Sequence, residues 1–213
     1  MVRIILVRHG ETAWNKEGKF QGRLDIELSD IGRQQAKKLA EALRDVHVDY
    51  IYSSPLKRSF ETAQLIAGWH SKEVVPAEEF NEIDHGSWEG MHLDAVIDAH
   101  GELYETWLNN PHEAKMPGGE ELRDIRERAV RKMTEILALT PDGMTVVIAG
   151  HDATNKVLLC YALGLDSSHF WQFKQGNAAI SILEYEKGIF RVTLLNDTCH
   201  LGGVLDETTT GAL

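Results

Sequence analysis

The sequence has few of the features that mark extracellular or membrane proteins. Its 213 residues contain two cysteines, Cys160 and Cys199, too few for the disulfide framework of a small secreted protein. No apolar run reaches the roughly 18–20 residues that a membrane-spanning helix needs. The apolar start at residues 2–7 leads into Arg8-His9 rather than into a signal-peptide cleavage site. We therefore expect a cytoplasmic protein with reduced thiols and no membrane partner.

Positive charge is also scarce. Lys and Arg number 22 against 33 Asp and Glu, which gives a formal net charge of −11. Binding to nucleic acids or to anionic membranes needs a basic face, so this balance argues against both. The ten histidines show none of the spacings typical of metal ligands, and we predict no metal and no cofactor. A small anionic substrate remains compatible with the sequence, since a site can be locally positive on an acidic protein.

Apolar periodicity predicts alternating strands and helices. Residues 2–7 and 144–149 are apolar runs with one polar residue each, Arg3 and Thr145, as expected for strands buried on both faces of a parallel sheet. Further strands are expected at 49–53, at 74–75 and in a hairpin of 178–185 and 189–195. Helices are expected at 30–45 after an N-cap at Ser29, from Pro55, at 119–139 and at 152–163. This order predicts an α/β fold, a three-layer α/β/α sandwich whose mostly parallel sheet has an antiparallel edge. We expect a single domain of residues 1–213, with a covering segment at roughly 78–118.

Basic and imidazole side chains follow three of the predicted strands. Arg8 and His9 come directly after the first strand, Arg58 follows the second, and His151 follows the fourth. Because ligands of open α/β sheets bind outside the carboxyl ends of the strands, these four groups are expected at one edge. Each of them alone is an ordinary strand-end or helix residue. Together they predict an anion site, and two guanidinium groups suit the oxygens of a phosphate.

Such a site is suited to phosphoryl transfer. An imidazole with an unperturbed pKa of about 6.5 can act as a nucleophile at neutral pH, while the other cationic groups stabilise the transferred group. The leaving alkoxide needs a proton from a buried carboxylic acid, and the candidates are Glu11, Glu82, Asp84 and Glu89. The sequence lacks the motifs of other phosphoryl-transfer enzymes, namely a GxxxxGK[ST] loop, a cysteine with an arginine six residues later, and an Asp-x-Asp pair followed by Thr or Val.

Blocks along almost the whole sequence resemble the histidine phosphatase superfamily, which has the phosphoglycerate-mutase-like fold. The matching residues, in chain order, are 6–15, 20–22, 28–32, 53–58, 62–63, Glu82 with Gly86, 88–90, 117–120 and 150–151. The resemblance implies the same three-layer fold. It also implies a metal-independent phosphomonoesterase that works through a phosphohistidine intermediate.

The resemblance further implies a role for individual residues. His9 is expected to be the phosphorylated nucleophile. Arg8, Arg58 and His151 are expected to complete the phosphate pocket, and Glu82 to act first as the general acid and then as the base for water. Substrate contacts are also expected from Asn15, which lends an amide to the phosphate, and from Gln21 and Gly22.

One stretch departs from the family pattern. Many relatives follow the second histidine with Gly or Thr and carry an arginine shortly after, whereas here His151 is followed by Asp152, and Lys156 lies four residues further on. Asp152 is expected either to pair with His151 or to cap the following helix. The family resemblance does not decide between these two roles.

Within the superfamily the sequence favours hydrolysis. Mutases resemble this core but carry longer insertions that exclude water, and this chain is compact between residues 58 and 117. Segments 81–91, 111–113, 170–171 and 195–202 are similar to those of metal-independent phosphoserine phosphatases. In that interpretation His85 and His200 meet the carboxylate of phosphoserine.

Three other interpretations stay open at this point. One is a phosphatase of broad specificity or one for sugar phosphates, such as α-ribazole phosphate, and another is a phosphoglycerate mutase. The third is a catalytically silent phosphate-binding module, which the intact set of predicted catalytic residues disfavours. The expected partner is a small phosphorylated metabolite. Residues 176–180 and the hairpin after them are expected to present an edge strand for self-association, which predicts a homodimer.

Overall fold

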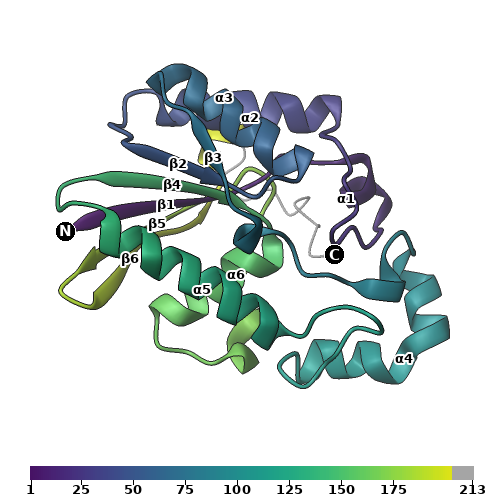
Figure 1. The fold of residues 1–213 in the computed structure, drawn as a ribbon. Helices are drawn as coiled ribbons and strands as arrows, with labels where there is room; N and C mark the ends of the chain where they lie inside the picture. The colour runs from purple at the N-terminus through teal and green to yellow at the C-terminus, as the bar shows by residue number, and fades with distance from the viewer. Residues whose placement is uncertain (203–213) are drawn as a thin grey trace.

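A six-stranded sheet forms the middle layer of the computed structural model, which describes residues 1–202 (Figure 1). The strands are β1 (Val2–Arg8), β2 (Tyr50–Ser53), β3 (Val74–Pro76), β4 (Thr145–Gly150), β5 (Ile180–Glu186) and β6 (Ile189–Asp197). Their order across the sheet is β3-β2-β4-β1-β5-β6. The first four strands are parallel, whereas β5 runs antiparallel to β1 and β6 antiparallel to β5. The predicted parallel sheet with an antiparallel edge is confirmed.

Helices cover both faces of the sheet (Figure 1). The helices α2 (Asp30–Leu43) and α3 (Lys57–His70) lie on one face, and α5 (Leu122–Leu139) and α6 (Asp152–Ala162) lie on the other. Alternate side chains of β1 enter the two layers, because successive residues of a strand point to opposite faces. Ile5 and Val7 pack on the α2–α3 side, whereas Ile4 and Leu6 pack on the α5–α6 side. The predicted three-layer sandwich is therefore correct.

Two helices begin later than the sequence predicts. The helix α3 starts at Lys57 rather than Pro55, because the backbone N–H of Lys57 donates to the carboxylate of Asp25 (2.7 Å). A residue distant in sequence therefore provides the cap. The helix α5 starts at Leu122 rather than at residue 119, because Glu121 and Asp124 form a capping box there. Both predictions of helix start were wrong: the cap of α3 comes from a residue distant in sequence, whereas the capping box of α5 is a local signal that the prediction missed.

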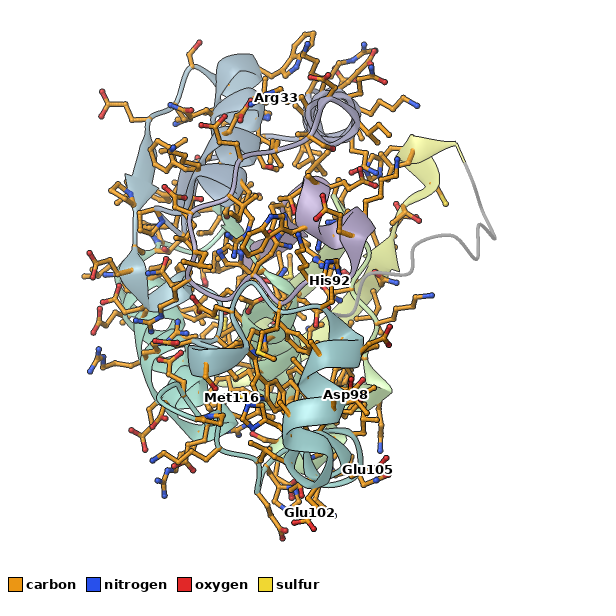
Figure 2. All side chains as sticks on the ribbon, turned by 90° about the vertical axis from the view of Figure 1, so that its right-hand side faces the viewer. Arg33, His92, Asp98, Glu102, Glu105 and Met116 are labelled. Carbon is orange, nitrogen blue, oxygen red and sulfur yellow. The ribbon has the colours of Figure 1, made fainter. Side chains whose placement is uncertain are left out.

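The remaining helices lie beyond the carboxyl ends of the parallel strands. They include α1 (Ala13–Glu17), α4 (Leu93–Asn109) and the 3₁₀ helices η1 (Glu78–Phe80), η2 (Gly86–Trp88), η3 (Ser167–Gln172) and η4 (Cys199–Leu201). His92 ties the start of α4 to α1, through a contact of its Nδ1 with the carbonyl oxygen of Glu17 at 3.1 Å. Figure 2 shows Asp98, Glu102 and Glu105 along the outer surface of α4.

Among the described helices, none has the length and apolarity needed to cross a membrane.

Two glycines allow β1 to end directly against the first turn of α2. A Cβ on Gly10 would collide with the carbonyl oxygen of Gly32, and a Cβ on Gly32 would collide with the carbonyl oxygen of Glu11. The backbone of Ser29 also donates to the carbonyl oxygen of Glu11 (2.9 Å). Because only hydrogen atoms fit between these backbones, the segment after β1 is held closely in place, and His9 with it.

Candidate active site

His9 lies at the carboxyl end of β1, the central strand, and its side chain is buried. Its backbone N–H donates to the carbonyl oxygen of Gly150 on the neighbouring strand (3.1 Å). The Nδ1 atom lies 2.7 Å from the carbonyl oxygen of Gly10, so Nδ1 carries the proton and Nε2 keeps its lone pair. Burial, with help from the charges of Arg58 and Arg8, holds the pKa of His9 well below its usual range. The imidazole is therefore neutral at physiological pH and suited to nucleophilic attack through Nε2.

His151 faces His9 from the end of the adjacent strand. The two ring centroids lie 5.2 Å apart in an edge-on arrangement. His151 is fully buried, and neither of its ring nitrogens has a hydrogen-bond partner among residues 1–202. Burial lowers its pKa, and the charge of Arg58 adds to this effect. Buried polar atoms are almost always paired in folded proteins, so these nitrogens point to a ligand that supplies the partner.

Arg8 and Arg58 bring two buried guanidinium groups to the same site. Arg8 donates to the carbonyl oxygen of Gln175 (2.5 Å). Arg58 donates to the carbonyl oxygens of Gly22 (2.7 Å) and Leu24 (2.9 Å), while its Nε has no partner in the described part of the chain. Burial lowers the pKa of Arg58 to about 10. Two like charges buried side by side are costly unless an anion joins them, as a phosphate dianion would.

The predicted substrate residues Asn15, Gln21 and Gly22 are brought to this part of the molecule. Thr12 links two of them, since its hydroxyl donates to Gln21 Oε1 (2.9 Å) and its backbone N–H donates to Asn15 Oδ1 (3.0 Å). The amide nitrogen of Asn15 is buried and has no partner within residues 1–202, so it is available to a phosphate oxygen. Gly22 contributes the carbonyl group that orients Arg58.

Glu82 is the buried carboxylic acid of the site. Its two oxygens accept backbone hydrogen bonds from Ile83 (3.0 Å) and from Ala153 at the start of α6 (3.3 Å). Burial raises the pKa of Glu82, and the nearby charge of Asp152 raises it further. Arg128 of α5 holds this segment by donating to the carbonyl oxygen of Glu82 (3.0 Å). The result is a carboxyl group that stays protonated to a higher pH than an exposed glutamate and can act as a general acid.

A small pocket opens beside Glu82. It is lined by Phe20, Glu82, His85, Trp107, Asp152, Ala153, Phe170 and Trp171. The ring centroid of His85 lies 5.0 Å from that of Phe20. Burial, together with the charge of Arg58, lowers the pKa of His85 to about 3. His85 therefore faces the pocket as a neutral group that can offer one N–H donor.

His200 is not among the residues that line this pocket. It lies in η4 and borders a surface depression with residues of α2 and the turn after it, namely Lys38, Glu41, Ala42, Arg44 and Asp45. The reason is that η4 follows β6, an outer strand, and packs toward α2 on one face of the sheet. The structure therefore brings His85 to Glu82 but does not bring His200 there.

The residues Asp152 and Lys156 were not predicted in the roles they take. His151, not Asp152, is the N-cap of α6, and neither predicted role of Asp152 is correct. Its carboxylate instead contacts Lys156 Nζ at 2.8 Å and Arg8 Nη1 at 3.9 Å. The i,i+4 spacing on a helix was the signal for the first of these pairs. Asn177, whose amide donates to the carbonyl oxygen of His9 (3.3 Å), had no signal in the sequence.

The arrangement can hold a tetrahedral anion between the two guanidinium groups and present it to His9 Nε2. The buried acid Glu82 then lies where a leaving group can receive a proton. Within residues 1–202, no group of histidine, cysteine, aspartate and glutamate side chains is arranged to hold a metal ion. The positive charge in the site comes from side chains of the chain itself.

The lowered pKa of His85 predicts an acid-sensitive fold. Below its usual pKa of 6.5, the unfolded chain takes up a proton at this residue, whereas the folded chain does so only near pH 3. This contribution to stability is present above pH 6.5 and is lost as the pH falls. From pH 7 to pH 5, His85 should lower the free energy of unfolding by about 2 kcal/mol.

Urea unfolding at the two pH values checks this expectation. The decrease should be about 2 kcal/mol smaller in His85→Gln than in the wild type. His47→Gln, the same substitution at an exposed histidine, provides the matched comparison. Equal decreases in the wild type and His85→Gln would contradict the predicted role of burial.

Comparison with known proteins agrees with the geometry of the site. Residues 4–198 match the model of the histidine phosphatase superfamily (branch 1). The chain is 41% identical over 202 residues to phosphoserine phosphatase 1 of Hydrogenobacter thermophilus, and the match covers 95% of each chain. A similar solved structure is YhfR of Bacillus stearothermophilus, with a TM-score of 0.90 and 30% identity, covering 94% of this chain and 100% of that one.

A second solved structure is a phosphoserine phosphatase mutant of Entamoeba histolytica in complex with phosphoserine. It has a TM-score of 0.85 and 32% identity, and the match covers 94% of this chain and 100% of that one. The family match includes the ends of β1 and β4 and all the segments that surround the site. The chain therefore belongs to the histidine phosphatase superfamily and is a histidine phosphatase.

Proposed function

We propose that this chain hydrolyses O-phospho-L-serine through a phosphohistidine at His9, without a metal ion. The observation that carries the chemistry is the neutral His9 imidazole between two buried guanidinium groups, with its Nε2 lone pair free. The choice of phosphoserine rests on the 41% identity to a phosphoserine phosphatase over nearly the full length of both chains.

The first step transfers the phosphoryl group to the enzyme. The Nε2 atom of His9 attacks phosphorus, and the bond between phosphorus and the ester oxygen breaks. Arg8, Arg58 and His151 stabilise the charge on the three equatorial oxygens during this transfer. Glu82 gives its proton to the ester oxygen, so that serine leaves as an alcohol.

The second step releases phosphate. Glu82, now a carboxylate, takes a proton from a water molecule, and the water oxygen attacks phosphorus. The bond between phosphorus and Nε2 breaks, inorganic phosphate leaves, and both His9 and Glu82 return to their starting protonation states. In the bound substrate, the N–H of the neutral His85 donates to the serine carboxylate, as the pocket places it beside Glu82.

We also propose a cytoplasmic location and a homodimer. The two cysteines are free thiols, and burial raises the pKa of Cys160 to about 11, so it stays protonated. The strand β6 is one of the two outer strands of the sheet in the described residues, and it leaves an edge to which a second copy can add.

A panel of metabolite phosphate esters tests the proposed activity. In the presence of EDTA, kcat/KM for L-phosphoserine should exceed that for other small monoesters by at least about tenfold, because the pocket recognises charged groups beyond the phosphate. Removal of EDTA should change nothing. Equal turnover of all esters would favour a broad phosphatase. Isomerisation of 3-phosphoglycerate without phosphate release would favour a mutase and contradict the proposal.

A further inference from the structure

The carboxylate of Asp152 has one oxygen that the protein leaves without a hydrogen bond. Its Oδ2 lies 2.8 Å from Lys156 Nζ. Its Oδ1 is buried and accepts no hydrogen bond within residues 1–202, and it lies 3.9 Å from Arg8 Nη1. The whole residue is only 8% exposed. A buried carboxylate oxygen without a donor is costly, so a ligand is the natural source of one.

Lys156 explains how a carboxylate can be buried at this position. Its side chain is 1% exposed, and its ammonium group lies over the rings of Phe170 (4.8 Å) and Trp171 (4.4 Å). The aromatic faces and Oδ2 of Asp152 stabilise this cation. Lys156 therefore neutralises the carboxylate through Oδ2, next to the aromatic wall of the pocket, and leaves Oδ1 without a hydrogen bond.

Only three of the eight residues that line the pocket carry ionisable groups. They are Glu82, His85 and Asp152, and the rest of the wall is apolar. Glu82 serves the ester oxygen in the proposed mechanism. His85, which is neutral, can donate to a carboxylate. Asp152 is the one remaining group, and an anion of this kind suits a positively charged part of the substrate.

We propose that Asp152 Oδ1 binds the α-ammonium group of the substrate and thereby selects phosphoserine against esters that lack the amine. This inference rests on the proposed phosphoserine phosphatase function and extends it to a new recognition residue. The two polar groups left over in the pocket, a neutral donor and an anion, match the carboxylate and the ammonium of an α-amino acid.

The position of Asp152 along the substrate supports this assignment. Glu82 accepts a hydrogen bond from the backbone of Ala153, the residue after Asp152, so the two carboxyl groups are neighbours at the start of α6. In phosphoserine the ammonium is carried by the second carbon from the ester oxygen. A substrate whose ester oxygen faces Glu82 therefore brings its ammonium close to Asp152. Without this carboxylate, Arg8 and the positive end of α6 would repel the ammonium.

A pair of matched substrates tests the inference. Racemic 3-phosphoglycerate differs from phosphoserine in having a hydroxyl in place of the ammonium. We expect Asp152→Asn to lower the ratio of kcat/KM for L-phosphoserine to that for 3-phosphoglycerate by about 10- to 100-fold, the effect of losing one charged hydrogen bond. Asp45→Asn, at an exposed position, is the control and should leave the ratio unchanged.

Each outcome decides the question. A fall in the ratio supports the inference. Equal losses on both substrates would show that Asp152 only positions Arg8 or Glu82, and would overturn it while the proposed function stands. A wild type without preference for phosphoserine would overturn the inference together with the choice of substrate. If Asp152→Asn does not fold, the double variant Asp152→Asn, Lys156→Met leaves no unpaired buried charge, and the same fall in the ratio is expected from it.

Discussion

Replacement of His9 by alanine should lower kcat for phosphoserine by more than about 10³-fold, because the variant has no nucleophile to form the covalent intermediate. Quenched reactions of the wild type should contain phosphate that is labile in acid and stable in base, and the variant should contain none. The matched control is His47→Ala, since His47 is exposed and far from the site in the chain. Activity of His9→Ala above one tenth of the wild type would rule out the proposed intermediate.

The same residue sets the acidic side of the pH profile. His9 attacks only when neutral, and its pKa is held well below 6.5 by burial and by the two arginines. Activity should therefore persist as the pH falls from 8 to 6, where an ordinary histidine would already gain its proton. A loss of kcat/KM centred near pH 6.5 would mean that the imidazole is not shielded in this way.

Replacement of Glu82 by glutamine should lower kcat for phosphoserine by about 10²- to 10⁴-fold, because the alkoxide of serine would leave without a proton. The substrate 4-nitrophenyl phosphate separates the two steps. Its leaving group needs no proton, so the variant should release about one nitrophenolate per enzyme in a burst and then turn over slowly. The slow phase reflects the missing base, and phosphohistidine should accumulate during it.

Stopped-flow absorbance detects this burst, and Glu78→Gln provides a control on an exposed residue of the same segment. In the wild type, activity toward phosphoserine should fall as the pH rises through the raised pKa of Glu82, because the acid must be protonated in the first step. That decrease should be absent from Glu82→Gln. A steady turnover of 4-nitrophenyl phosphate at the wild-type rate would show that another group activates water.

The strand ends could be read from the sequence because buried strands leave a strong local pattern. The runs at 2–7 and 144–149 are apolar except for Arg3 and Thr145, and the structure has β1 and β4 there, side by side and buried except for Arg3. Parallel neighbours end at the same edge of a sheet, so His9 and His151 had to meet once both strands were recognised. The position of Arg58 at the same edge could be predicted by the same reasoning, although its helix starts later than predicted.

Contacts between distant segments could not be read in this way. The cap of α3 comes from Asp25. The segment that carries Glu82 is held by Arg128, on a helix more than forty residues further along the chain. For His200 the predicted contact with the substrate is not found, because the similarity of the tail to relatives does not tell which face of the sheet η4 packs on. Such contacts depend on packing angles between elements, which local periodicity does not encode.

The sequence by itself determined the layers of this protein, the order of its elements and the identity of the groups at its strand ends, because hydrophobic period and strand direction are local properties. Only the tertiary structure decided how those groups behave. Burial lowers the pKa values of His9 and His151 and raises that of Glu82. It also leaves one carboxylate oxygen of Asp152, a residue that lines the pocket, without a hydrogen bond within residues 1–202. These effects arise from the loss of water around a charge, and that loss occurs only when distant parts of the chain close over the site.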